Sequence, residues 1–371
     1  MLIVRSPVRI SFAGGGTDLP SYYEKFDGSV LSTSINKYFY TVLQPRRDGK
    51  IQIISSDLRV VETWPDISEM TMSGTDLEIP LAVLKDLRTN VSVNLFLASE
   101  IPPGTGLGSS ASVCVNVLKM MTTYLQLPMS KHELAARAYH IAHNVLGKSV
   151  GKQDEYASAF GGLNLITFRS NGSVQVDPIN VDPGVLRELE NNLMLFFTGT
   201  AHHSWTILQE QEKSTRSEKG VAIDSLHAIR AMTERMRRVI VSGDLDDFGT
   251  LLHEGWELKK KVASGISNTR IDEVYHLARQ NGAIGGKITG AGGGGFLLLY
   301  CPQTNQAKVR HALTNWGARE MEFSFDLNGA QVIVNDPFID RDERSGMRWT
   351  FRPVPATPLS KLPAILKHHP G

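Results

Sequence analysis

The sequence predicts a protein that mixes strands with helices and joins them by unusually glycine-dense loops. Strand-like runs of apolar residues occur at positions 2–4, 10–12, 30–34, 38–44, 50–55 and 92–97. Apolar residues at spacings of three and four predict helices over 111–124, 132–146 and 271–280. Three segments with clustered glycines follow or precede these elements, so the candidate chemistry lies in the loops.

Composition excludes several classes of function. With 371 residues the chain is long enough for roughly two domains. Its 39 basic and 38 acidic side chains give a net charge of +1, which leaves no electrostatic footprint for nucleic acid or an anionic membrane. The two cysteines, Cys114 and Cys301, sit in apolar runs and are predicted to be buried thiols. The N-terminal segment, residues 1–7, is too short for a signal peptide, so we expect a cytoplasmic protein.

The most informative loop has the sequence IPPGTGLGSSAS at residues 101–112. Gly104, Gly106 and Gly108 lack Cβ atoms, so their backbone can take positive φ and bring N–H groups close to an anion. The predicted helix over 111–124 follows at once, and a helix N-terminus attracts phosphate. The sequence therefore predicts a phosphate loop, with a glycine-rich turn as the alternative.

Two serines stand between this loop and the helix. Ser109 and Ser110 are suited either to capping the helix N-terminus or to holding Mg²⁺ on the bound phosphates. The residues themselves leave both interpretations open.

Two further segments contain glycines beside a carboxylate. The first is AGGGTDLP at 13–20, where backbone approaches another group closely or forms a bulge. The second is GKQDEYASAFGG at 151–162, which has Asp154 and Glu155 on a short predicted helix. An acidic pair on a helix is also typical of a solvated face, which is the alternative here.

A third glycine-rich segment, GGKITGAGGGG at 285–295, contains a formal G-x-G-x-x-G. A dinucleotide fingerprint opens a helix, whereas these glycines lead into the strand-like run 296–300. The match is therefore rejected. We expect the three glycine-rich loops, at 13–20, 101–112 and 285–295, to point into one cleft together with Asp154. Such a cleft suits phosphoryl transfer, because that reaction depends on positioning and charge stabilisation.

Taken together, the segments 7–18, 102–111 and 287–294 resemble the three motifs of the GHMP kinases, the family of galactokinase, homoserine kinase and mevalonate kinase. The resemblance covers residues 1 to about 335. It implies an α+β fold with an N-terminal GHMP domain (1–190) that has a ribosomal-protein-like half. It also implies a ferredoxin-like C-terminal GHMP domain (191–335), with the active site between the two. Residues 336–371 form a proline-containing tail outside the resemblance.

The resemblance also implies roles for individual residues. Asp154 matches the catalytic aspartate, and Arg9 matches the arginine that pairs with it. The expected ATP-binding residues are Pro103, Gly104, Thr105, Gly106, Leu107, Gly108, Ser109 and Ser110, and Ser110 is also the expected Mg²⁺ ligand. The expected substrate-binding residues are Gly15, Gly16, Thr17, Asp18, Gly290, Ala291, Gly292 and Gly293.

The details of the motifs suggest a substrate. Galactokinase has Glu-His where this chain has Gly15-Gly16, which argues against galactose. The segments 12–20 and 151–162 most resemble the D-glycero-D-manno-heptose 7-phosphate kinases, which phosphorylate the anomeric hydroxyl. A kinase for another sugar such as fucose, or a weakened relative that binds nucleotide as a sensor, remains the alternative.

Two positions depart from the family pattern. Many relatives have a Mg²⁺-binding glutamate about twelve residues before the catalytic aspartate, where this chain has Ala142-His143-Asn144. They also often have arginine where this chain has His202. The expected partners are ATP, Mg²⁺ and a small sugar or sugar phosphate, with no nucleic acid and no membrane, and the expected state is a monomer or homodimer.

Overall fold

The computed structural model describes residues 1–72, 74–88, 90–199, 204–216 and 220–336. His202 and all but the first residue of the predicted tail lie outside these ranges. Within them, no helix is long and apolar enough to cross a bilayer.

The first sheet is built on two long antiparallel strands. Four of the predicted strand runs merge into these two strands, since β1 and β2 continue across the polar positions between the runs, with register shifts at Pro7/Val8 and Ser11/Ala13. The sheet order is β12-β1-β2-β5-β3-β4, and β6 and β7 extend it from β2. Its strands are β1 (Leu2–Ala13), β2 (Gly28–Pro45), β3 (Ile51–Ser55), β4 (Val60–Trp64), β5 (Val93–Ser99), β6 (Leu163–Phe168), β7 (Val174–Pro178) and β12 (Gln331–Asn335).

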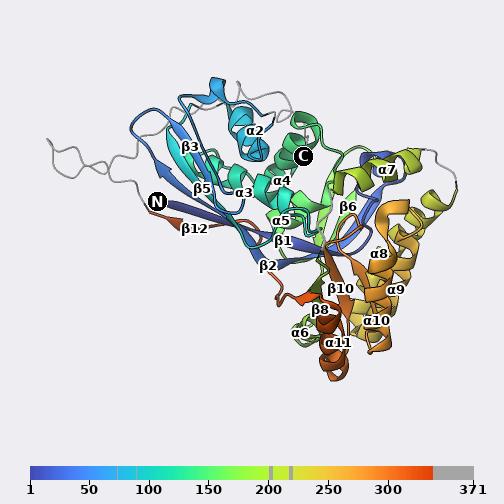
Figure 1. The fold of residues 1–371 in the computed structure, drawn as a ribbon. Helices are drawn as coiled ribbons and strands as arrows, with labels where there is room; N and C mark the ends of the chain where they lie inside the picture. The colour runs from blue at the N-terminus through green and yellow to red at the C-terminus, as the bar shows by residue number, and fades with distance from the viewer. Residues whose placement is uncertain (73, 89, 200–203, 217–219, 337–371) are drawn as a thin grey trace.

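Four helices pack on this sheet and enclose the first core (Figure 1). They are α2 (Glu78–Leu87), α3 (Ser109–Tyr124), α4 (Lys131–His140) and α5 (Gln153–Phe160). The helix predicted over 132–146 is confirmed, but its last turn, Ile141–Val145, widens into a π-helix. The short helix α1 (Pro20–Phe26) follows the first glycine loop.

The second sheet has four antiparallel strands in the order β11-β8-β10-β9. They are β8 (Leu193–Phe197), β9 (Gly285–Ile288), β10 (Phe296–Tyr300) and β11 (Arg319–Glu320). All five residues of β10 are buried because both faces of the strand are covered. This explains why its sequence is a continuous apolar run and does not alternate.

The remaining helices come after β7 in the chain. They are α6 (Pro183–Asn192), α7 (Ser204–Arg216), α8 (Val221–Ser242), α9 (Leu245–Lys259), α10 (Thr269–Gln280) and α11 (Gln303–Trp316). Of these, α6, α9, α10 and α11 contact strands of the second sheet, whereas α8 packs on β1, β2 and α9, and α7 packs on α1 and α8 (Figure 1). Helices α10 and α11 contribute to the core on one side of the sheet.

A third hydrophobic core lies between the first sheet and the second. Residues of β1 and β2 pack there against residues of β8, β10, α8 and α9. The rings of Phe12 and Phe248 meet edge to face with centroids 5.2 Å apart. The chain also returns at its end, because β12 pairs with β1 and Asn335 lies opposite Leu2. The mixed α+β class is thus confirmed, and the division at 190/191 stays a prediction.

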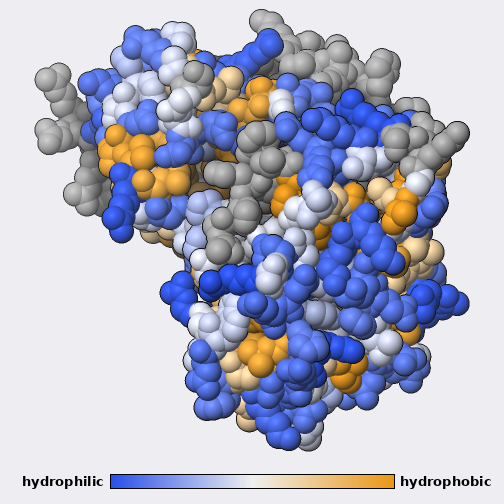
Figure 2. Space-filling view, turned by 45° about the vertical axis from the view of Figure 1, so that its right-hand side comes forward, coloured by the Kyte–Doolittle hydropathy of each residue, from blue (hydrophilic) through white to orange (hydrophobic). Residues whose placement is uncertain are grey.

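The face of the molecule in Figure 2 is mainly polar. Figure 2 shows a mainly hydrophilic face in which apolar residues form small separate areas. The large apolar side chains exposed among the described residues are scattered over different elements; they are Met1, Val61, Val145, Val221, Val241, Leu327 and Ile333. Both cysteines are buried, as predicted.

Candidate active site

The predicted phosphate loop at 101–112 and the glycine-rich segment at 285–295 lie against each other. A Cβ on Gly290 would meet Cα of Gly106 at 2.7 Å, and a Cβ on Gly295 would meet the carbonyl oxygen of Thr105 at 2.3 Å. The backbone N–H of Phe296 donates to that same oxygen at 3.3 Å. Two segments far apart in sequence therefore pack backbone to backbone, which only glycine permits at this distance.

Helix α3 begins directly at the end of the phosphate loop. Its N-cap is Gly108, with φ of 77°, and no side chain caps it. Of the two interpretations left open for Ser109 and Ser110, capping is therefore wrong; they are the first two helical residues and line the pocket. The uncapped N–H groups and the positive end of the helix dipole are left to bind an anion.

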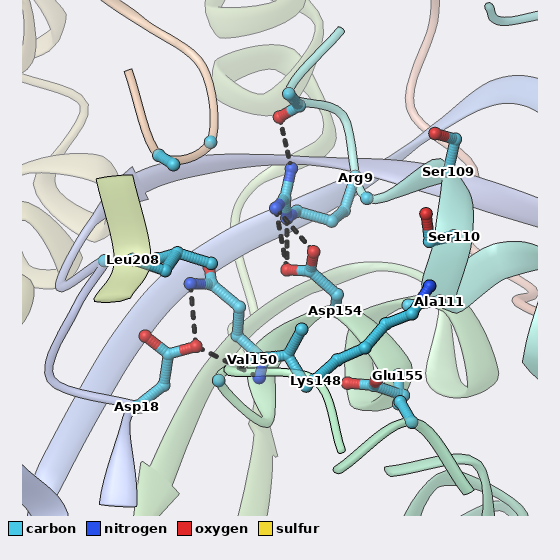
Figure 3. Close-up of a pocket in the computed structure, with 18 of the residues that line it drawn as sticks. Arg9, Asp18, Ser109, Ser110, Ala111, Lys148, Val150, Asp154, Glu155 and Leu208 are labelled. Carbon is cyan, nitrogen blue, oxygen red and sulfur yellow. Dashed lines mark hydrogen bonds and ion pairs between the residues drawn. The ribbon is translucent and has the colours of Figure 1, made fainter. Parts of the chain in front are cut away.

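Arg9 and Asp154, which the resemblance expects to pair, contact each other. Arg9 on β1 donates from Nε and Nη2 to the two carboxylate oxygens of Asp154, at the start of α5, both at 2.7 Å. The remaining nitrogen, Nη1, donates to the carbonyl oxygen of Gly106 at 2.7 Å. Because a bidentate pair fixes both partners, the carboxylate is held at the phosphate loop (Figure 3).

Asp154 lies beside Gly108, the last residue of that loop. A Cβ on Gly108 would lie 3.1 Å from Oδ2 of Asp154. Burial raises the pKa of Asp154 and the guanidinium of Arg9 opposes this rise, while the nearby carboxylate of Asp18 adds to it. A carboxylate whose pKa is raised is a stronger proton acceptor than a solvated one.

The alternative of a solvated acidic face is wrong. The side chain of Asp154 is 25% exposed and points into the pocket, and Glu155 is 2% exposed. Oε2 of Glu155 has no hydrogen-bond partner. Burial and the charge of Asp154 raise the pKa of Glu155 well above the ordinary value of glutamate.

A second set of polar groups surrounds Asp18 on the opposite side of the pocket (Figure 3). Its carboxylate accepts from the N–H of Gly16 at 2.9 Å and from Nε2 of Gln153 at 2.9 Å. A Cβ on Gly151 would lie 1.9 Å from Oδ2 of Asp18, so glycine is required there. The segments 13–20 and 151–162 thus meet at this carboxylate.

Comparisons with known proteins identify the family of this chain. The family models of the GHMP kinases N terminal domain and the GHMP kinases C terminal match residues 78–162 and 229–319. D-glycero-alpha-D-manno-heptose 7-phosphate kinase of Campylobacter jejuni is 31% identical over 334 residues, which cover 88% of this chain and 97% of that protein. The chain is a GHMP kinase.

Other relatives match most of the length of this GHMP kinase. A crystal structure of a D-glycero-D-manno-heptose 1-phosphate kinase from Bacteroides thetaiotaomicron has a TM-score of 0.77 and 29% identity, and the match covers 91% of this chain and 100% of that one. The L-fucokinase/L-fucose-1-P guanylyltransferase of Bacteroides fragilis is 28% identical over 88% of this chain, which corresponds to 38% of that longer protein.

The pocket of this GHMP kinase brings together most of the residues predicted from the sequence. Those that line it are Arg9, Gly15, Gly16, Asp18, Gly104, Gly106, Gly108, Ser109, Ser110, Asp154, Gly290 and Ala291. Thr17 lies behind the lining, with its hydroxyl 2.8 Å from the carbonyl oxygen of Gly14 and 2.9 Å from that of Ser29. Gly292 and Gly293 pack against Ile266.

Three residues of the phosphate loop also stay outside the lining: Pro103, Thr105 and Leu107. Thr105 and Leu107 are buried, and their carbonyl oxygens hold the loop by accepting from Phe296 and Arg9. These residues shape the loop, and its glycines and serines face the pocket.

Sequence reasoning missed two buried lysines. Lys259, the last residue of α9, lines the pocket and donates to the carbonyl oxygen of Gly15 at 3.1 Å and to Oε1 of Gln211 at 2.9 Å. Burial lowers the pKa of Lys259 to about 8. Lys287 on β9 is also buried, and burial next to Lys259 and Arg9 lowers its pKa to about 7.

Lys287 begins the family-like segment 287–294, but Lys259 had no signal in the sequence. Lys259 stands in the charged stretch ELKKK, where a solvated position is the ordinary expectation. Only the tertiary structure separates buried Lys259 from its exposed neighbour Lys261. The described residues contain no group of three or more His, Cys, Asp or Glu that could bind a metal ion by themselves.

Proposed function

We propose that this GHMP kinase transfers the γ-phosphoryl group of ATP to the anomeric hydroxyl of D-glycero-D-manno-heptose 7-phosphate. One observation carries the reaction type: Arg9 fixes Asp154 beside Gly108, at the mouth of the phosphate loop. The substrate is supported by the Campylobacter jejuni relative, which matches along nearly its full length.

In this proposal, the phosphate loop, Asp154 and Arg9 have separate roles. The loop over Gly104–Gly108 and the first turn of α3 bind the phosphates of ATP. Asp154 accepts the proton of the sugar hydroxyl as its oxygen bonds to the γ-phosphorus and the bond to the bridging oxygen of ADP breaks. Arg9 stabilises the charge that develops on the transferred group while it holds Asp154 in place.

The residues also fit a magnesium ion on the nucleotide, although Ala142 offers no ligand. Both oxygens of Asp154 are occupied by Arg9, whereas Oε2 of Glu155 is buried without a partner in the same pocket as Ser110 and Ala142. Mg²⁺ takes one or two carboxylates together with phosphate oxygens and waters. We propose Ser110 and Glu155 as its protein ligands; the ion would neutralise phosphate charge.

This assignment of the metal ligands has its own test. In Glu155→Gln, the affinity for Mn²⁺ in the presence of ADP, measured by electron paramagnetic resonance, is expected to fall at least about 10-fold. The exposed control Glu273→Gln should leave it unchanged. Equal Mn²⁺ affinity in wild type and Glu155→Gln would remove Glu155 from the metal site.

The second candidate is a 1-kinase for another sugar, such as fucose, which the similarity to the Bacteroides fragilis fucokinase favours. A panel of heptose 7-phosphate, free heptose and fucose, with ADP release and phosphorus NMR of the product, separates the two. A new anomeric phosphate on heptose 7-phosphate is the expected result. Preferential turnover of fucose would replace the proposal, and ATP binding without turnover on the whole panel would indicate a sensor.

A further inference from the structure

Several buried polar atoms around the Gly15–Gly16 turn have unused hydrogen-bonding capacity. Oγ of Ser11, Oε1 of Gln153 and Nε2 of Gln211 have no hydrogen-bond partner. A Cβ on Gly15 would lie 3.7 Å from Oγ of Ser11. Buried polar groups are normally paired, so a cluster of unpaired ones next to a pocket points to a ligand that completes them.

The chemistry of their neighbours fixes which way the two amides face. Lysine only donates, so the amide of Gln211 must present Oε1 to Lys259 and keep its NH₂ group free. An ionised carboxylate only accepts, so Gln153 must present its NH₂ group to Asp18 and keep Oε1 free. One free donor and one free acceptor therefore flank the turn.

Lys259 adds a second donor to this set. Its ammonium group has three protons, and the carbonyl oxygen of Gly15 and Oε1 of Gln211 accept two of them. The third is available at the pocket, which Lys259 lines together with Asp18.

We propose that Lys259 binds a hydroxyl group of the sugar, with Gln211 as the residue that positions its ammonium group, and that this subsite recognises adjacent ring hydroxyls. This inference rests on the proposed sugar-kinase function and names residues from α9 and α7 as determinants of specificity. Gly16 leaves the space that the pair needs, because a Cβ there would lie 2.2 Å from Nε2 of Gln211.

The mixture of donors and acceptors favours hydroxyls over the phosphate of the substrate. A hydroxyl both donates and accepts, and can therefore bridge Lys259 and Asp18. A phosphate only accepts at neutral pH, and the carboxylate of Asp18 and the free Oε1 of Gln153 would repel it. The phosphate of the sugar is therefore placed away from this turn.

The test compares Lys259→Met with the exposed control Lys261→Met in the full-length enzyme. We expect the KM for heptose 7-phosphate to rise about 10- to 100-fold in Lys259→Met, since a hydrogen bond to a charged group is lost, with smaller changes in kcat and none in the KM for ATP. Sugar binding measured by calorimetry without ATP should weaken by the same factor. Lys261→Met should match wild type.

Monodeoxy analogues of the substrate identify the hydroxyl. For the hydroxyl that Lys259 binds, removing both partners should cost little more than removing one, whereas other positions should be additive. Gln211→Leu should raise the KM for the sugar, and Gln211→Glu should restore it because a carboxylate also accepts from Lys259.

Two outcomes would contradict the inference while the proposed function stands. These are unchanged sugar affinity in a folded, ATP-binding Lys259→Met enzyme, and additive losses with every deoxy analogue. Absence of turnover of any sugar by the wild-type enzyme would instead contradict the proposed function itself.

Discussion

The Arg9–Asp154 pair and the groups around Lys259 differ in how complete they are without a ligand. Arg9 uses all its donor nitrogens, with two hydrogen bonds of 2.7 Å to Asp154 and a third to Gly106, and each carboxylate oxygen of Asp154 keeps a lone pair to accept a proton. On the recognition side, Lys259 and Gln211 keep unused protons and Gln153 keeps an unused acceptor.

If the further inference holds, the fold alone builds the Arg9–Asp154 pair and the sugar completes the groups around Lys259. The catalytic pair is preorganised, so its loss should mainly affect the chemical step. The recognition side pays for unpaired polar groups until the sugar binds, so changes there should mainly affect affinity. The predictions below test that separation.

The largest effect is expected on the catalytic side. Asp154→Asn should lower kcat by about 10²- to 10⁴-fold, because the amide cannot accept the hydroxyl proton, with a much smaller change in the KM for either substrate. Steady-state kinetics check this, and circular dichroism checks the fold. Asp247→Asn, an exposed position on α9, is the control. If kcat is unchanged in the folded variant, Asp154 is not the base.

The two glycines of the recognition side should behave differently. Gly16 has φ of 102° and no room for a Cβ, whereas a Cβ on Gly15 would meet no atom of the protein closer than 3.7 Å. Gly16→Ala should therefore lower the free energy of unfolding by about 1–3 kcal/mol, and Gly15→Ala by less. Urea unfolding measures both, and equal losses would show that the turn adapts.

The affinity for the sugar should depend on pH through Lys259. Its pKa of about 8 means that the ammonium charge is present below pH 8 and is lost above it, so the KM for the sugar should rise several-fold between pH 7 and 9. Asp18, Lys287 and Arg9 also face this region, so an assignment is needed. Lys259→Arg should abolish the inflection, and one that persists would belong to another group.

The smallest effect concerns stability. Burial raises the pKa of Glu155 in the folded state above the value of 4.5 for a solvated glutamate. Glu155 therefore binds a proton more tightly when folded, and its contribution to stability is lost as pH rises from about 4.5 through the raised pKa. Without Mg²⁺, Glu155→Gln should melt above wild type at neutral pH and converge with it below pH 4.5. A constant difference would contradict this linkage.

Glycine spacing was enough to predict a tight loop at 104–108, and the family resemblance was needed to expect the contact between Arg9 and Asp154; neither indicated Lys259 and Gln211. Glycine spacing at 104–108 reports a backbone constraint, which acts within a few residues. Lys259 and Gln211 lie at the Gly15–Gly16 turn only because α9 and α7 pack beside a loop more than 190 residues earlier, and nothing local distinguishes them from solvated residues. The interpretation of Ser109 and Ser110 as caps failed because Gly108 already ends the loop in a left-handed conformation.

The pairing of β12 with β1 has a consequence for how the chain is made. β1 is synthesised long before β12, because the strand that covers the outer edge of β1 comes more than 300 residues later in the chain. At 5–20 residues per second, that edge stays open on the ribosome for roughly 15 seconds or longer. An open strand edge is a template for association with other chains, so the nascent protein passes through a vulnerable interval that the finished one does not show.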